Sequence, residues 1–428
     1  MKLKRIIQLP LIRSVGIYTV ASILNSAIPF LLLPILTRYL TPEDYGIVSM
    51  FGVLVSLITP FIGLNIQGAV QRVYFKREKI NIKIYITNCI YILLCSTAVV
   101  SLIFFLFSGY IAKITSLPEK LLFVAIAIAF AQFISSIVLV LWQVQIKPAQ
   151  YGVYQISTTL LNASLSIWLI ISLGMAWQGR ILGQLVSFSL FGVIGILILR
   201  KDKWLKIKYN RSYIKHALSF GVPLIPHAVG GVVMTMTDRI FITNMVGIEA
   251  TGIYTVGFQI GMIINILATS FNQAYVPWLF AQLKANIYTK KLMIVKMTYF
   301  YFGIIIFLAL GLSFFAPWFL DFFVGKEFSG SSVFIIWIAI GYAFNGMYFM
   351  VTNYIFYAEK TAILAWITFG SAILNIGLNY VFISKYGAIG AAQATTIIYF
   401  IKFISTWILA ARVYNMPWRL KKNENYIG

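Results

Sequence analysis

A lysine inside an apolar segment is the first candidate for chemistry in this sequence. Lys402 lies in an apolar run about ten residues before Arg412, which corresponds to about 15 Å along a helix. A charge near the middle of a bilayer costs about 2.5–3.5 kcal/mol on insertion scales. A cationic side chain that binds an anionic group would explain this cost. The alternative is a side chain that extends toward the nearer interface.

Three titratable residues lie together in the apolar segment 217–243. Asp238 and Arg239 could carry protons or bind a charged substrate, but adjacent residues on a helix point about 100° apart, so we expect that they do not share one direction. They could instead stabilise the helices around them. His227 follows Pro226 near the middle of the segment; it suits proton coupling because histidine titrates near physiological pH. Hydrogen bonding between helices is its alternative role.

Four further polar residues are candidates for contact with a ligand. Arg38 and Arg72 lie at opposite ends of the first two predicted helices, and either guanidinium could bind phosphate at the mouth of a cavity. Anchoring at the membrane interface is the alternative. Gln67 and Gln273 occupy equivalent positions in the two halves of the chain. They could line a cavity or bridge neighbouring helices by hydrogen bonds.

These residues are embedded in a strongly apolar chain. Of 428 residues, 60% are hydrophobic and 11% are charged, and the mean hydropathy is +0.88. A soluble domain is usually about 45–50% apolar and about 25% charged, so much of this surface must face lipid. The net charge of +23 falls in short clusters between apolar runs. This distribution sets membrane topology and argues against nucleic acid as a partner.

Runs of roughly 20 apolar residues predict spanning helices, because that length crosses a bilayer. The first run, which ends near Leu36, is too long for a signal peptide, and we expect it to be retained. The sequence predicts an all-α integral membrane protein with about twelve transmembrane helices. Their predicted ranges are 15–36, 46–66, 84–107, 121–142, 153–173, 178–199, 217–243, 252–279, 293–316, 331–356, 362–383 and 387–410.

The loops between these spans are unequally basic. Of the 34 Lys and Arg residues, about 26 fall on the side that carries both termini. About seven, Arg180 among them, fall on the other side. Cytoplasmic loops carry the excess of Lys and Arg. Both termini are therefore predicted to be cytoplasmic.

The chain divides into two similar halves. The predicted parts are an N-terminal six-helix lobe at 1–200, a basic cytoplasmic linker at 201–216 and a C-terminal six-helix lobe with a basic tail at 217–428. Matching positions support a duplication: Gly46 with Gly252, Gln67 with Gln273, Asn162 with Asn375 and Gly174 with Gly387. An even number of helices per half gives both halves the same orientation, as in parallel-repeat transporters.

Each half begins with a helix that contains two prolines. These are Pro29 and Pro34 in the first half and Pro223 and Pro226 in the second. Proline inside a helix frees backbone groups and bends it. The prolines are candidate hinges between two lobes that rock, although proline is also simply commoner in spanning helices.

Two segments resemble a known family. Residues 33–47, LPILTRYLTPEDYGI, resemble the first interhelical segment of the polysaccharide biosynthesis (Wzx-type O-antigen flippase) family. Residues 237–242, TDRIFI, and 249–259, EATGIYTVGFQ, resemble its counterpart in the second half. The resemblance covers nearly the whole chain. It implies a MATE-like fold of two six-helix lobes, as in the MOP superfamily shared with the drug-exporting MATE proteins.

The resemblance also implies an activity. A member of this family moves an undecaprenyl-diphosphate-linked oligosaccharide from the cytoplasmic to the outer leaflet of a bacterial inner membrane. The implied partners are that lipid-linked oligosaccharide, membrane lipid and other membrane proteins of polysaccharide assembly. No cofactor is implied, and coupling to protons or to sodium ions stays open.

Other functions remain as alternatives. A MATE-type exporter of cationic drugs usually needs intramembrane carboxylates, and Asp238 is the only such candidate in a predicted span. A lipid II flippase usually carries two further helices. A membrane-embedded enzyme needs clustered acid–base residues, whereas the chain has two His residues and shows no paired carboxylates. The sequence therefore predicts a transport protein rather than an enzyme.

Overall fold

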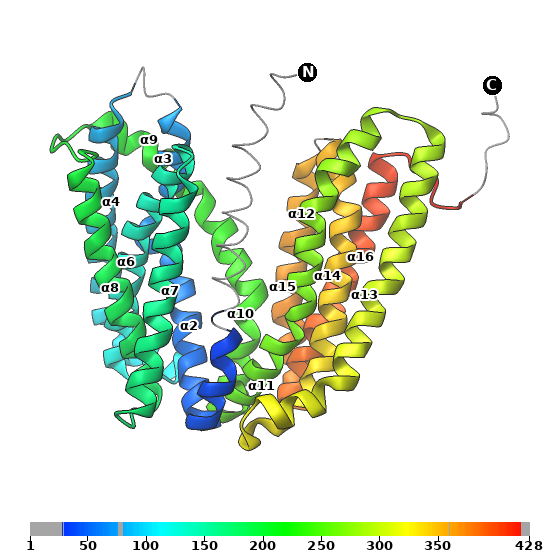
Figure 1. Cartoon of the computed structure of the whole chain (residues 1–428), viewed down its shortest axis with the longest axis horizontal. Helices are drawn as coiled ribbons and strands as arrows, with labels where there is room; N and C mark the ends of the chain where they lie inside the picture. The colour runs from blue at the N-terminus through cyan, green and yellow to red at the C-terminus, as the bar shows by residue number, and fades with distance from the viewer. Residues whose placement is uncertain (1–27, 29, 76–79, 359, 421–428) are drawn as a thin grey trace. The chain divides into compact units, whose positions relative to one another are not determined.

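A computed structural model describes residues 28, 30–75, 80–358 and 360–420. These residues form helices and connecting turns, with no strand among them (Figure 1). Eleven helical stretches in this part are long and apolar enough to cross a membrane, and they coincide with predicted spans two to twelve. Most of the first predicted span lies outside the described residues. Its described end is an apolar helix at Phe30–Tyr39.

The chain forms two compact units, of which the first ends at Met236. Its labelled elements are α2 (Pro42–Gly63), α3 (Gln67–Tyr74), α4 (Ile82–Leu106), α5 (Ser108–Thr115), α6 (Glu119–Val144), α7 (Pro148–Ile171), α8 (Trp177–Lys201), α9 (Arg211–Gly221) and the short 3₁₀ turn η1 (Val222–Leu224). The short helices α3, α5 and α9 were not predicted as separate elements.

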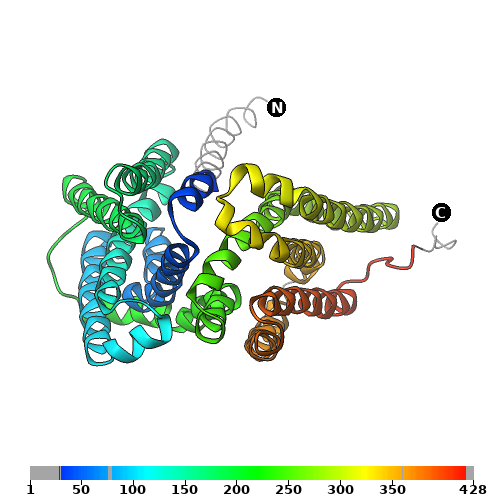
Figure 2. The same cartoon turned by 90° about the horizontal axis from the view of Figure 1, so that it is seen from below.

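The second unit begins at Thr237, inside α10 (Ile225–Met245). It continues with α11 (Ile248–Gly261), α12 (Ile263–Lys284), α13 (Tyr288–Phe323), the 3₁₀ turn η2 (Lys326–Ser331), α14 (Ser332–Tyr357), α15 (Thr361–Tyr386) and α16 (Ala388–Val413). In each unit the long helices run side by side and form a bundle (Figure 1 and Figure 2).

Polar caps fix where several helices begin. Before α2, the Thr41 hydroxyl accepts a hydrogen bond from Asp44 N at 3.1 Å, and Thr41 N donates to the Asp44 carboxylate at 3.0 Å. This reciprocal pair satisfies backbone donors that a helix start leaves free, and Pro42 fits the first helical position. The Asn81 and Asn210 side chains accept bonds at the starts of α4 and α9 in the same way.

The two units repeat one packing scheme. In the first unit α6 packs against α2, α4 and α8; in the second α14 packs against α11, α13 and α16. The paired glycines also share a backbone conformation, with φ +63° at Gly174 and φ +64° at Gly387. Both lie in the connection to the last helix of their half, where this positive φ favours glycine. These features agree with the predicted duplication.

The basic segment after α8 is attached to α4. The fully buried Asn88 donates to Lys208 O at 2.9 Å and accepts from Asn210 N at 2.9 Å. The Thr87 hydroxyl accepts from Lys206 N at 3.0 Å. The segment therefore belongs structurally to the first unit. The domain division at 201–216 stays a prediction, since the boundary between the compact units lies further along, inside α10.

The seventh predicted span is interrupted near its prolines. Pro223 lies in η1 between α9 and α10, and Pro226 lies in the first turn of α10. Pro34 lies within the helix Phe30–Tyr39, and Pro29 is outside the described residues. The break is the expected effect of proline on a helix. The hinge role itself stays a prediction.

Candidate substrate site

Few charged side chains are buried in the described part of the chain. Those that are fully buried are Arg180, Asp238 and Arg239. Lys402 is partly buried. All four lie in spanning helices, where a charge is costly and usually marks a functional site.

Asp238 and Arg239 form a buried ion pair in α10. Arg239 Nη1 lies 3.2 Å from Asp238 Oδ1, and Arg239 N donates to the same oxygen at 2.8 Å. The hydroxyl of the fully buried Tyr254, from α11, donates to Asp238 Oδ2 at 2.5 Å. The expectation that adjacent residues do not share a direction was therefore wrong. A helical wheel gives the direction of Cβ, whereas the long arginine side chain turns back toward its neighbour.

An aromatic row connects this pair to α16. The Arg239 guanidinium lies 4.3 Å from the ring centroid of Phe258, within range of a cation–π contact. The row continues from Phe258 to Tyr342 at 5.8 Å and from Tyr342 to Tyr399 at 5.6 Å between centroids. Tyr399 lies one helical turn before Lys402 on α16. The aromatic row thus runs from the buried pair to α16, and Lys402 lies one turn further along that helix.

Lys402 contacts a ring rather than an acid. Its Nζ lies 3.9 Å from the ring centroid of Tyr348, on α14. Among the described residues, no carboxylate lies within ion-pair distance of Lys402. The face of the ring attracts the cation but does not neutralise its charge. Lys402 therefore brings a net positive charge into the interior of the second unit.

Arg180 is a buried cation that sequence reasoning missed. Arg180 Nη1 donates to Asn162 Oδ1 and to Ser166 Oγ, both at 2.8 Å, across the α7–α8 contact. Gly183 allows this close approach, since a Cβ there would lie 2.5 Å from Ser166 Oγ. The sequence analysis counted Arg180 among the loop residues because it lies at the margin of a predicted span. The repeated position Asn162 was the available signal, since it is the side chain that Arg180 contacts.

The remaining basic candidates lie at more open positions. Arg38 is exposed at the end of the Phe30–Tyr39 helix, and His227 is exposed in the first turn of α10. Arg72 is exposed on α3, with its guanidinium 5.9 Å from the Phe220 ring centroid. Their roles in binding or ion coupling stay predictions.

The two glutamines differ in their surroundings. Gln67 begins α3, and its Oε1 is buried without a hydrogen-bond partner among the described residues. Gln273 is exposed on α12. Next to it, the Asn272 Oδ1 accepts a hydrogen bond from Asn353 of α14 at 2.9 Å. The helix bridge expected of Gln273 is thus made by its neighbour, and the cavity-lining role of both glutamines stays a prediction.

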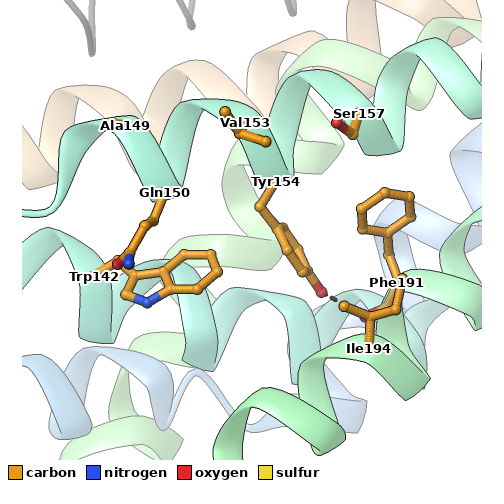
Figure 3. Close-up of a pocket in the computed structure, with 8 residues that line it drawn as sticks. All are labelled: Trp142, Ala149, Gln150, Val153, Tyr154, Ser157, Phe191 and Ile194. Carbon is orange, nitrogen blue, oxygen red and sulfur yellow. Dashed lines mark hydrogen bonds between the residues drawn. The ribbon is translucent and has the colours of Figure 1, made fainter. Parts of the chain in front are cut away.

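The first unit also carries an apolar hollow of about 460 Å³ between α6, α7 and α8 (Figure 3). Trp142, Val153 and Phe191 are among the residues that line it. The Tyr154 hydroxyl points toward Phe191 and Ile194 and donates to Phe191 O at 2.5 Å (Figure 3). Val153 is 67% exposed, which is normal for a side chain that faces lipid tails. The hollow offers few polar groups to a charged substrate.

Eleven apolar helical stretches among the described residues, arranged in two repeated units, define a multi-pass membrane protein. The chain belongs to the polysaccharide biosynthesis protein family, whose profile matches residues 11–283. The MatE family profile matches residues 223–381. The multi-pass membrane fold and the family predicted from the sequence are thus confirmed.

Relatives and solved structures agree with this family. The chain is 27% identical over 424 residues to an uncharacterized membrane protein of Haemophilus influenzae, covering 97% of this chain and 98% of the relative. It is 25% identical over 420 residues to the capsular polysaccharide biosynthesis protein CapF of Staphylococcus aureus, covering 92% and 98%.

Among solved structures, the lipid II flippase MurJ in an inward closed conformation matches with TM-score 0.72 and 16% identity, over 94% of this chain and 87% of that one. An inward-facing multidrug resistance MATE family transporter of the MOP superfamily matches with TM-score 0.65 and 16% identity, over 93% and 96%. At this identity the matches establish the fold alone.

Proposed function

We propose that this protein moves an undecaprenyl-diphosphate-linked oligosaccharide from the cytoplasmic to the outer leaflet of a bacterial inner membrane, by alternating access of two lobes. The family and the name of the S. aureus relative support a role in surface polysaccharide assembly. The likeness to a lipid II flippase supports a fold able to move a lipid-linked substrate. Both termini are cytoplasmic in this proposal.

The proposal rests on the sign of the charged side chains inside the spanning helices. Asp238 is already neutralised by Arg239, at 3.2 Å. Arg180 and Lys402 have no carboxylate at ion-pair distance in the described ranges, so the spans hold excess positive charge. The hydrogen bonds of Arg180 run from Nη1 to uncharged acceptors, Asn162 Oδ1 and Ser166 Oγ, so they do not neutralise its charge. Cationic groups of this kind suit the diphosphate of a polyprenyl carrier.

The excess of positive charge in the spans also disfavours an exporter of cationic drugs. An exporter of organic cations needs a carboxylate that is free to exchange the cation for a proton or a sodium ion. Asp238 is held by an ion pair and by the Tyr254 hydroxyl. Excess positive charge would also repel a cationic drug.

The test is deletion of the gene, followed by assay of the leaflet in which lipid-linked oligosaccharide resides. The proposal predicts accumulation on the cytoplasmic leaflet and loss of surface polymer, both restored by the gene. Unchanged surface polymer together with new sensitivity to cationic dyes would instead establish a drug exporter. Accumulation of the cell-wall precursor lipid II would point to a lipid II flippase.

A further inference from the structure

A polar groove lies in the first unit between α6, α7 and α8. Its volume is about 240 Å³. Most of its lining surface is apolar, but the lining includes six uncharged polar side chains: Gln132, Ser135, Ser136, Gln155, Thr158 and Thr159. Phe188 of α8 adds an aromatic wall. The charged residues of the candidate substrate site are not part of this lining.

The groove lies at membrane depth. Ser135 is about 14 Å from the end of α6 at Val144, and Gln155 is about 11 Å from the start of α7 at Pro148, at 1.5 Å per residue. These two helix ends are joined by a short turn. The hydrocarbon core is about 30 Å thick, so the polar lining falls near its middle.

A lipid-filled groove would not explain these residues. Gln155 Oε1 is buried and has no hydrogen-bond partner within the described ranges. An amide oxygen left in this state is costly, because a buried polar group needs a partner. The spanning helix α7 is also the least apolar of the eleven apolar stretches. A polar ligand or water is therefore expected in the groove.

The other side of α7 provides the contrast. Tyr154 lines both the polar groove and the apolar hollow of Figure 3. On the side of the hollow, Val153 and Trp142 present apolar surface. On the side of the groove, Gln155 and Thr158 present an amide and a hydroxyl. α7 thus separates an apolar surface from a polar path within one unit.

We propose that this groove binds one uncharged sugar ring of the transported oligosaccharide. The amides of Gln132 and Gln155 can both donate to and accept from sugar hydroxyls, and Phe188 can pack against the apolar face of a ring. The Ser and Thr hydroxyls of the groove donate to carbonyls of their own helices, so they remain as acceptors. A volume of about 240 Å³ is below the roughly 300–1,000 Å³ of whole-ligand pockets, so the groove fits part of a ligand. The inference rests on the proposed function, and it assigns the sugar and the diphosphate to different residues.

The chain offers a matched pair of variants. Gln155→Leu removes the amide from the groove. Gln150→Leu makes the same change on α7 at a residue that lines the apolar hollow instead (Figure 3). Leucine favours membrane insertion and helix formation, so both variants should be produced and folded. Equal amounts in the membrane and equal melting temperatures verify this.

The experiment measures saturation-transfer NMR from the full-length protein in nanodiscs to a panel of neutral methyl glycosides. The wild type and Gln150→Leu are expected to bind at least one glycoside, and Gln155→Leu to bind it about tenfold more weakly, as for one lost hydrogen bond. Binding of inorganic diphosphate should be equal in all three. Absence of glycoside binding by the wild type, or equal binding by the wild type and Gln155→Leu, would overturn the inference.

The assay separates this inference from the proposed function. Glycoside binding is measured without transport, whereas the proposed function is judged by the deletion strain. In that strain, Gln155→Leu should restore surface polymer about tenfold more slowly than Gln150→Leu after induction. Equal rates would refute a sugar contact while leaving the flippase activity intact.

Discussion

Replacement of Asp238 by Asn tests the energetics of the buried ion pair. The change preserves shape but removes the charge that Arg239 faces at 3.2 Å. Arg239 is only 7% exposed, so its guanidinium would remain buried without a counter-charge. Breaking a buried pair in this way costs about 3–5 kcal/mol. The Tyr254 hydroxyl would also lose its charged acceptor.

The assay is thermal unfolding of the purified protein in nanodiscs. The second unit covers residues 237–428. For a unit of this size, each kcal/mol shifts the midpoint by roughly 2–4 °C, so Asp238→Asn should lower it by about 6–20 °C. The double variant Asp238→Asn/Arg239→Gln removes both charges and should recover more than half of this loss. Glu249→Gln, at an exposed carboxylate on α11, is the control and should change little.

Two results would refute this reasoning. An unchanged midpoint for Asp238→Asn would show that the pair contributes no stability. A double variant as unstable as the single one would show that the unpaired guanidinium is not the cause. The double variant also decides a functional point: if it is stable and restores surface polymer, Asp238 is not needed for ion coupling.

Three further predictions concern other residues. Lys402→Met should abolish restoration of surface polymer at normal protein level, because it removes the buried cation over Tyr348, whereas Lys385→Met, at an exposed lysine, should not. Normal polymer from the Lys402 variant would remove its substrate role. Gly183→Ala should destabilise by about 1–3 kcal/mol in thermal unfolding, since the added Cβ meets α7 at 2.5 Å, whereas Gly52→Ala meets nothing within 4 Å and should be neutral. Asn88→Ala should speed trypsin cleavage in the segment 202–210, because two backbone hydrogen bonds are lost; an unchanged digestion rate would contradict the attachment.

Much of the fold follows from the sequence because lipid imposes simple rules. Runs of apolar residues of bilayer length must be helices, and they coincide with spans two to twelve. The proline pair at Pro223 and Pro226 predicted a bend within one helix, whereas the structure has a 3₁₀ turn there that separates α9 from α10. The short helices α3, α5 and α9 were missed because each is too short to span, so hydropathy gives no signal for it.

The candidate site was less predictable, because the sequence shows neither how far a side chain reaches nor where each spanning helix ends. Asp238 and Arg239 pair because an arginine reaches several ångströms beyond its Cβ, which a helical wheel ignores. Arg180 was assigned to a loop because span boundaries are uncertain by several residues. The polar groove around Gln155 escaped a search for charges, since its side chains are neutral. These side chains come together only because α6 and α7 pack against each other, and the sequence does not show that packing.

The attachment of residues 206–210 to α4 also has a mechanical consequence. A polar segment without such attachments between α8 and α9 could move freely relative to the helices of the first unit. Asn88 and Thr87 of α4 hold this segment by hydrogen bonds. Tyr85 OH, also on α4, lies 2.9 Å from His216 Nδ1 of α9. The connection between α8 and α9 is therefore fixed to α4. The covalent link beyond α9 is η1 and the rod of α10. The two units meet within α10, between Met236 and Thr237, so this continuous helix is the covalent link between them, and the proline break at its start lies inside the first unit.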